Sequence, residues 1–296
     1  MKSFEEFKEL LVDTFEGFEV EFNRIEKLNY SYNGVTIRKA GENFGATCDV
    51  DEIYRDYLNN EDALVNFYDF INRNLESSEE ANAIRSFIND TSVLYDVSNY
   101  RVRICSVSGK EQYLEDKIWR PFLDLAIVVY ANLYEDNNGS GTVIVTKDIA
   151  QNTGLSEDEI IDAAIKNSMS YDPPFYSSLF DVIKDASPEC EDLPDPGNPI
   201  YVVSNKRKTN GAYAMLDTEG ALKSVAELLG NEYYILPSSV HELLCLPKDD
   251  NEAQERFLFE MVSEVNSSCV SEQGFLSNSI YKYNNGVVEL VNVKVC

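Results

Sequence analysis

Apolar residues recur along this chain with two periods, and the longer period predicts amphipathic helices. Within each predicted helix they fall at helical intervals, which places them on one face. The segments with this spacing are 4–15, 64–75, 160–165, 222–229 and 257–265. In the last segment the predicted core face consists of Phe257, Leu258, Met261, Val262 and Val265. We therefore expect five helices that each pack one apolar face on a core.

Polar residues in front of three of these helices predict where they begin. Ser3 with Glu6, and Ser156 with Glu159, have the spacing of a capping box. In that motif the serine hydroxyl accepts a backbone N–H of the first turn, and the glutamate accepts the N–H of the serine. Thr218 is placed to cap the helix over 222–229.

The shorter period, in which apolar and polar residues alternate, predicts strands joined as hairpins. Residues 122–134, FLDLAIVVYANLY, are rich in β-branched and aromatic residues and predict one buried strand that pairs back onto 142–146. Tyr32-Asn33-Gly34 predicts a turn between two earlier strands. The other predicted strands are 18–28, 35–38, 200–203, 212–216, 233–236, 243–246, 279–283 and 287–291.

Hairpins that alternate with single helices indicate the fold class. This order favours an α+β fold, with an antiparallel or mixed sheet built from hairpins and helices packed on it. Residues 185–199, DASPECEDLPDPGNP, predict an exposed linker or long loop. We expect an N-terminal α+β region over 1–115 and a C-terminal α+β region over 116–296, or one continuous unit.

The charge of the chain narrows the choice of partners. Asp and Glu number 52 against 25 Lys and Arg, which gives a net charge of −27. Such a surface repels phosphate backbones and anionic lipid headgroups, so we expect neither nucleic acid nor a membrane as a partner. A basic protein is the partner that fits this charge; the alternative, which we favour, is that the charge only keeps the protein soluble.

Cysteine and histidine usage narrows the chemistry and the compartment. None of the six cysteines forms a C-x-x-C pair, and the first residues, MKSFEEFKELL, lack the apolar core of a signal peptide. We therefore expect free thiols in the cytoplasm. His241 is the single histidine, so mechanisms that need two histidines are excluded. We expect no metal site and no cofactor.

Four polar residues form the candidate catalytic group: Ser238, Ser239, His241 and Glu242. In a strand, Ser239 and His241 would project to one face, as a nucleophile and its base require, while Glu242 would point to the other. The alternative is a turn between two core strands, in which the hydroxyls and the imidazole satisfy backbone groups. We favour the turn.

A basic run is the second candidate site. Lys206, Arg207 and Lys208 lie in a predicted loop between two strands of an otherwise acidic chain. Such a loop offers positive charge and backbone N–H groups to an anion or an acidic ligand. The alternative, which we favour, is a solvated hairpin tip.

Several of these segments together resemble a known family. FLDLAIVVYANL (122–133), SNK (204–206), GAYAML (211–216) and above all YILPSSVHELLCLP (234–247) resemble an uncharacterised domain-of-unknown-function family of Gram-positive anaerobes. The resemblance covers roughly 20–290 and departs from the pattern at Asp217-Thr218, where the family has Pro-Gly. The resemblance implies a cytoplasmic protein and one continuous unit, but it supplies no mechanism.

Three functions stay open at this point. The first is a non-enzymatic interaction module of immunity or adaptor type, whose acidic face binds a basic protein. The second is a serine hydrolase that uses Ser239 and His241. The third is an acidic DNA mimic. Oligomeric state does not follow from the sequence.

Overall fold

The chain divides into two compact units. The computed structural model describes residues 2–42, 44–60, 62–77, 82, 86–87, 90–135, 140–187, 197, 199–249 and 252–293. The first unit comprises Met1–Val93 and Leu133–Gly141, and the second Leu94–Asn132 and Thr142–Cys296. That the regions 1–115 and 116–296 form separate domains stays a prediction.

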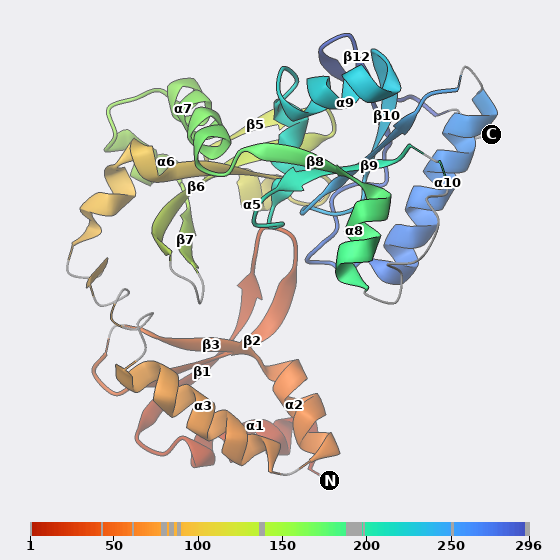
Figure 1. Ribbon diagram of the computed structural model, residues 1–296. Coiled ribbons are helices and arrows are strands. Elements are labelled where there is room, and N and C mark those ends of the chain that lie inside the picture. Colours follow the sequence, from red (N-terminus) through yellow and green to blue (C-terminus); the bar gives the residue numbers. More distant parts are fainter. Residues whose placement is uncertain are drawn as a thin grey trace. The chain divides into compact units, whose positions relative to one another are not determined.

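The first unit packs three helices on one face of a three-stranded antiparallel sheet (Figure 1). The strands are β1 (Phe18–Glu26), β2 (Ser31–Lys39) and β3 (Gly45–Asp49), in the order β1-β2-β3. The helices are α1 (Phe4–Thr14), α2 (Val50–Asn59) and α3 (Ala63–Ser77). Phe7, Leu11 and Phe15 at helical spacing meet Val35 and Ile37 at strand spacing in one core.

The predicted turn at Tyr32-Asn33-Gly34 is wrong, because these residues lie inside β2. Gly34 pairs with Asn23 on one side and with Asp49 on the other. A Cβ atom at this position would lie 2.3 Å from Cγ1 of Ile25. The glycine therefore permits a close approach of β1 and β2, and the chain reverses instead between Glu26 and Ser31.

The rest of the chain forms two further antiparallel sheets. In the smaller sheet the order is β4-β6-β5, with β7 also paired to β6. Its strands are β4 (Tyr100–Ser106), β5 (Trp119–Phe122), β6 (Leu125–Glu135) and β7 (Ser140–Ile144). The larger sheet has the order β13-β12-β10-β11-β9-β8. Its strands are β8 (Pro174–Ser178), β9 (Tyr201–Asn205), β10 (Glu232–Pro237), β11 (Leu243–Pro247), β12 (Tyr281–Asn284) and β13 (Val287–Leu290).

Helices cover these sheets, and the predicted α+β class is confirmed. The α-helices are α5 (Glu111–Leu114), α6 (Lys147–Gln151), α7 (Glu157–Tyr171), α8 (Leu179–Ala186), α9 (Ala221–Leu229) and α10 (Glu252–Cys269). Short 3₁₀ helices are η1 (Thr91–Tyr95), η2 (Val97–Asn99) and η4 (Gly211–Leu216). Both predicted capping boxes are present, at the starts of α1 and α7. Leu258 and Val262 of α10 pack against Tyr234 and Leu236 of β10.

Several element predictions in the second unit are wrong in detail. The segment 122–134 is not one strand, because Leu123 and Asp124 form a two-residue turn between β5 and β6. The predicted strand over 212–216 is instead part of η4. Residues 211–215 are all buried, so this apolar run lacks the alternation of buried and exposed positions that is typical of a half-buried strand.

Two predicted helix features are also wrong. Thr218 does not cap α9, since the carboxylate of Asp217 accepts the N–H of Ala221 at 2.8 Å instead. Phe257 is 63% exposed and Val265 is 46% exposed, so the buried face of α10 is narrower than predicted.

The described residues also bear on membranes and metals. None of their helices combines the length and the apolar character needed to cross a membrane. Across the same residues, no group of three or more His, Cys, Asp or Glu side chains is arranged to hold a metal ion. Most of the predicted linker over 185–199 lies outside the described residues.

Candidate functional site

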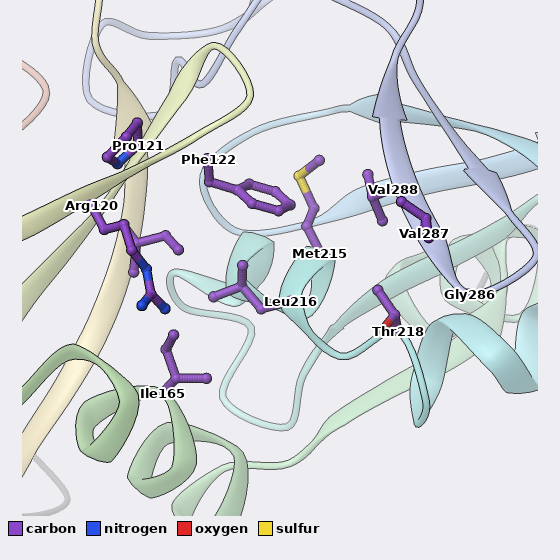
Figure 2. A pocket seen from close by; sticks show the side chains of 11 residues that line it. Arg120, Pro121, Phe122, Ile165, Met215, Leu216, Thr218, Gly286, Val287 and Val288 are labelled. Atoms are coloured by element: carbon purple, nitrogen blue, oxygen red, sulfur yellow. The ribbon is translucent and has the colours of Figure 1, made fainter. Parts of the chain in front are cut away.

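A pocket of about 380 Å³ opens in the second unit where β5, α7, η4 and β13 meet (Figure 2). Its wall is mainly apolar, formed by Phe122, Ile165, Met215, Leu216 and Val288. Figure 2 shows the ring of Phe122 pointing toward the side chain of Met215. Small-molecule sites begin at roughly 300 Å³ and are mostly apolar with a few polar groups, so this hollow has the size and character of a binding site.

Local structure explains how these side chains reach the pocket. Met215, fully buried, and Leu216, half-buried, end the 3₁₀ helix η4. Phe122 is the last residue of β5 before the sharp turn. Gly286, with φ of +95°, completes the tight turn after Asn285 and presents Val287 and Val288 to the opposite wall. Only glycine adopts this backbone conformation without strain.

Arg120 is the one charged residue among the described residues that line the pocket. The guanidinium of Arg120 is held by two carboxylates of α7. Its Nη2 atom lies 3.0 Å from Oδ1 of Asp162, and its Nη1 atom lies 3.8 Å from Oδ1 of Asp158. Because one cation faces two anions, the guanidinium is already compensated and offers little to a further anion.

A second hollow of about 300 Å³ adjoins the first and shares Gly286 with it. Glu219, Lys223 and Glu227 line it together with Tyr283. Lys223 pairs with Glu219 at 2.9 Å, which leaves the carboxylate of Glu227 as additional negative charge. The hollow beside the apolar pocket therefore has one more carboxylate than cations among its lining residues.

The candidate catalytic residues lie elsewhere, in the connection between β10 and β11. Residues 238–242 form no strand, so Ser239 and His241 lack the strand on which the nucleophile-and-base alternative depended. Oγ of Ser239 accepts the backbone N–H of His241 at 3.0 Å, and Oγ of Ser238 donates to Oε1 of Glu242 at 3.3 Å. Nδ1 of His241 accepts the backbone N–H of Asn210 at 3.0 Å.

These contacts are those of a turn that satisfies its own backbone. With Nδ1 of His241 as an acceptor, the proton of the neutral imidazole lies on Nε2. Among the described residues, no hydrogen bond joins a serine hydroxyl to this imidazole. The triad logic requires that bond between nucleophile and base.

The basic run forms an exposed loop after β9, and part of its charge is already compensated. The backbone N–H of Lys206 donates to Oδ1 of Asp172 at 3.1 Å, and Nε of Arg207 lies 3.9 Å from the other oxygen of this buried carboxylate. Arg207 also donates to the hydroxyl of Tyr171 at 2.7 Å. Burial raises the pKa of Asp172, and the backbone N–H donors of the loop oppose this rise. Lys206 and Lys208 are exposed, so their contact with an anion stays a prediction.

The model of a family described as "Family of unknown function (DUF5688)" matches residues 2–285, nearly the whole chain. This chain belongs to DUF5688. No curated protein and no solved structure matched it. The resemblance stated from the sequence is thereby confirmed at the level of a family of unknown function.

Two of the segments that carried that resemblance line the pocket of this DUF5688 protein. Phe122 and Ile127 come from 122–133, and Met215 and Leu216 come from 211–216. The sequence analysis missed the pocket, because its walls come from segments far apart in the chain.

A cluster around Asp124, also missed, fixes the β5–β6 turn in this DUF5688 chain. The carboxylate accepts the hydroxyls of Ser277 and Ser279, each at 2.9 Å, and of Tyr281 at 2.7 Å. Burial, and next the charge of Asp124, raise the pKa of Tyr281, which keeps its phenol a donor. Phe122 directly precedes this turn, so the cluster also fixes the wall of the pocket that Phe122 forms.

Proposed function

We propose that this DUF5688 protein is a cytoplasmic, non-enzymatic interaction module that binds a basic partner through its acidic exterior. The net charge of −27 supports the proposal, because a field of this size attracts cationic proteins and repels nucleic acid and anionic membranes. An immunity-like or adaptor-like role fits this description.

The observation that carries the proposal is the placement of acids on α1 and directly after it. Glu5, Glu9, Asp13 and Glu16 are exposed and follow one another at intervals of three or four residues. Lys8, paired with Glu5 at 3.1 Å, is the one basic residue of the helix. Like charges at i,i+4 destabilise a helix, and an acid in its last turn opposes the helix dipole. Because this arrangement lowers the stability of the helix, recognition of a basic partner would explain why the chain carries it.

Capture from the parent cell tests this proposal. The tagged chain is expected to retain a basic protein at low salt and to release most of it at moderate salt, because exposed ion pairs are screened. The variant Glu9→Gln/Asp13→Asn/Glu16→Gln is expected to retain less. Its matched control, Glu9→Asp/Asp13→Glu/Glu16→Asp, keeps the charge and is expected to retain the partner.

Capture of nothing basic, or of a partner that salt does not release, would contradict the proposal. A captured DNA-binding protein that duplex DNA displaces would favour the DNA-mimic hypothesis instead. The same eluate therefore separates the two acidic-surface functions.

The hydrolase hypothesis has its own test. The hydroxyl of Ser239 accepts a backbone N–H and that of Ser238 donates to Glu242, so we expect no activated nucleophile in this turn. A fluorophosphonate reagent is expected to leave both serines unlabelled, as read by mass spectrometry. Labelling at Ser239 that disappears in His241→Ala would establish the hydrolase.

A further inference from the structure

We propose that the pocket bounded by β5, α7, η4 and β13 receives an aliphatic side chain of the basic partner, with positively charged residues of that partner on either side. The inference rests on the proposed function and adds a second contact, in the second unit, to the acids on α1 of the first unit. It follows from the apolar wall of the pocket and from the carboxylates that accompany Arg120 and Lys223 (Figure 2).

The apolar wall is exposed in the free protein. Val287 is 56% exposed, and Phe122, Ile165 and Leu216 are half-buried around the opening. An aliphatic side chain that enters would remove these surfaces and its own surface from water. The burial of both apolar surfaces favours the bound state.

The charge around the opening selects the flanking residues of the occupant. Asp158 and Asp162 pair with Arg120, which lines the pocket. Glu219, Glu227 and Lys223 line the adjoining hollow. These residues supply four carboxylates and two cations near the two hollows. A peptide that carries Lys or Arg next to its apolar residue matches this excess of negative charge.

The same charges argue against other occupants. An anionic ligand would find the guanidinium of Arg120 already bonded to two carboxylates and would be repelled by the remaining acids. A neutral apolar ligand would contact the apolar wall but would gain nothing from the nearby carboxylates. Only an apolar group flanked by cations can contact both the apolar wall and these carboxylates.

The turn at Asn285-Gly286 contributes to both the apolar pocket and the adjoining hollow. Gly286 lines both hollows, and its φ of +95° excludes other residues without strain. A Cβ atom there would meet Oε1 of Glu219 at 3.7 Å, so the glycine leaves the acidic side of the passage free of a side chain. An extended peptide can therefore lie across the turn with its apolar residue in the pocket and a cation in the adjoining hollow.

Fluorescence anisotropy with three labelled pentapeptides tests the inference on the full chain. The first peptide is Lys-Arg-Leu-Arg-Lys, the second has Ser in place of Leu, and the third has Gln in place of all four cations. We expect the first to bind about tenfold more tightly than either of the others, a factor that corresponds to about 1.4 kcal/mol.

Variants locate the contact. Ile165→Trp fills the pocket and is expected to reduce the affinity of the Leu peptide to that of the Ser peptide. Val265→Trp adds the same side chain to an exposed position of α10 outside the pocket and is expected to change nothing. Val287→Ser removes part of the exposed wall without touching the core and is expected to weaken the Leu peptide by about threefold.

The outcomes separate this inference from the proposed function. If both basic peptides bind equally, or if Ile165→Trp and Val287→Ser bind like the parent chain, the pocket is not the contact, while salt-dependent capture of a basic partner still stands. If the neutral Leu peptide binds as tightly as the basic one, the site is a plain apolar pocket and the inference is wrong. If capture itself fails, the proposed function fails first.

Discussion

At the scale of single residues, Leu123 adopts a backbone conformation that costs free energy. It lies in the two-residue turn between β5 and β6 with φ of 58°, in the left-handed region. For a residue with a bulky side chain this conformation costs about 1–2 kcal/mol. Asp124 beside it is held by three hydroxyl donors, which explains why the turn keeps this geometry.

Replacing Leu123 by a residue that tolerates the left-handed region should stabilise the protein. We expect Leu123→Asn to raise the free energy of unfolding by about 1 kcal/mol, measured by urea denaturation. Leu155 is equally exposed, at 41%, and is absent from the residues with positive φ, so Leu155→Asn is the matched control and should bring no gain. A loss of stability in Leu123→Asn would contradict the argument from strain.

Cys105 makes stability depend on alkaline pH. Burial raises the pKa of its thiol from 9.0 to about 11. Between these values the unfolded chain has lost the thiol proton and the folded chain keeps it, so the folded state binds more protons and its stability falls as pH rises. Below pH 9 both states hold the proton and the effect is absent.

The slope and its control can be measured directly. We expect one thiol to contribute a loss of up to about 1.4 kcal/mol per pH unit in this window, seen in denaturation curves at several pH values. Cys105→Ala should lower the slope by that amount, whereas Cys269→Ala, at an exposed position, should leave it unchanged. Equal slopes in all three proteins would refute this role for Cys105.

At the scale of elements, local chemistry was predictable and long-range packing was not. The capping boxes of α1 and α7 involve residues three positions apart, so the sequence alone defined both helix starts. The function of Gly34 depends on Ile25 in the neighbouring strand, and the 3₁₀ form of 211–216 depends on burial on all sides. The pocket could not be predicted for the same reason, since β5, α7, η4 and β13 meet only through tertiary packing.

The Asp124 cluster connects the β5–β6 turn with residues 277–281, and no local sequence pattern pairs these two segments. Asp124→Ala would leave buried hydroxyls of Ser277 and Tyr281 without their acceptor, so we expect a loss of about 3 kcal/mol in the free energy of unfolding. Asp185→Ala, at an exposed position of α8, is the control and should cost less than about 0.5 kcal/mol. Equal effects in urea denaturation would show that the cluster contributes nothing.

At the scale of the whole molecule, the net charge of −27 opposes folding. Carboxylates repel one another more strongly in the compact state than in the expanded chain, and salt screens this repulsion. We expect the Tm to rise by roughly 3 °C, about 1 kcal/mol, when NaCl is raised from low to moderate concentration. KCl at equal ionic strength should give the same shift, and a Tm that stays constant or falls would contradict the argument.

The hydroxyls bound to Asp124 come from residues 153 to 157 positions later in the chain. During translation, at about 5–20 residues per second, the β5–β6 turn is therefore made roughly 8–30 s before its partners. Throughout that interval the strained Leu123 lacks the hydroxyl donors beside it, and the wall that carries Phe122 cannot be completed. The binding that we propose for the pocket therefore requires that the chain has been synthesised as far as β13.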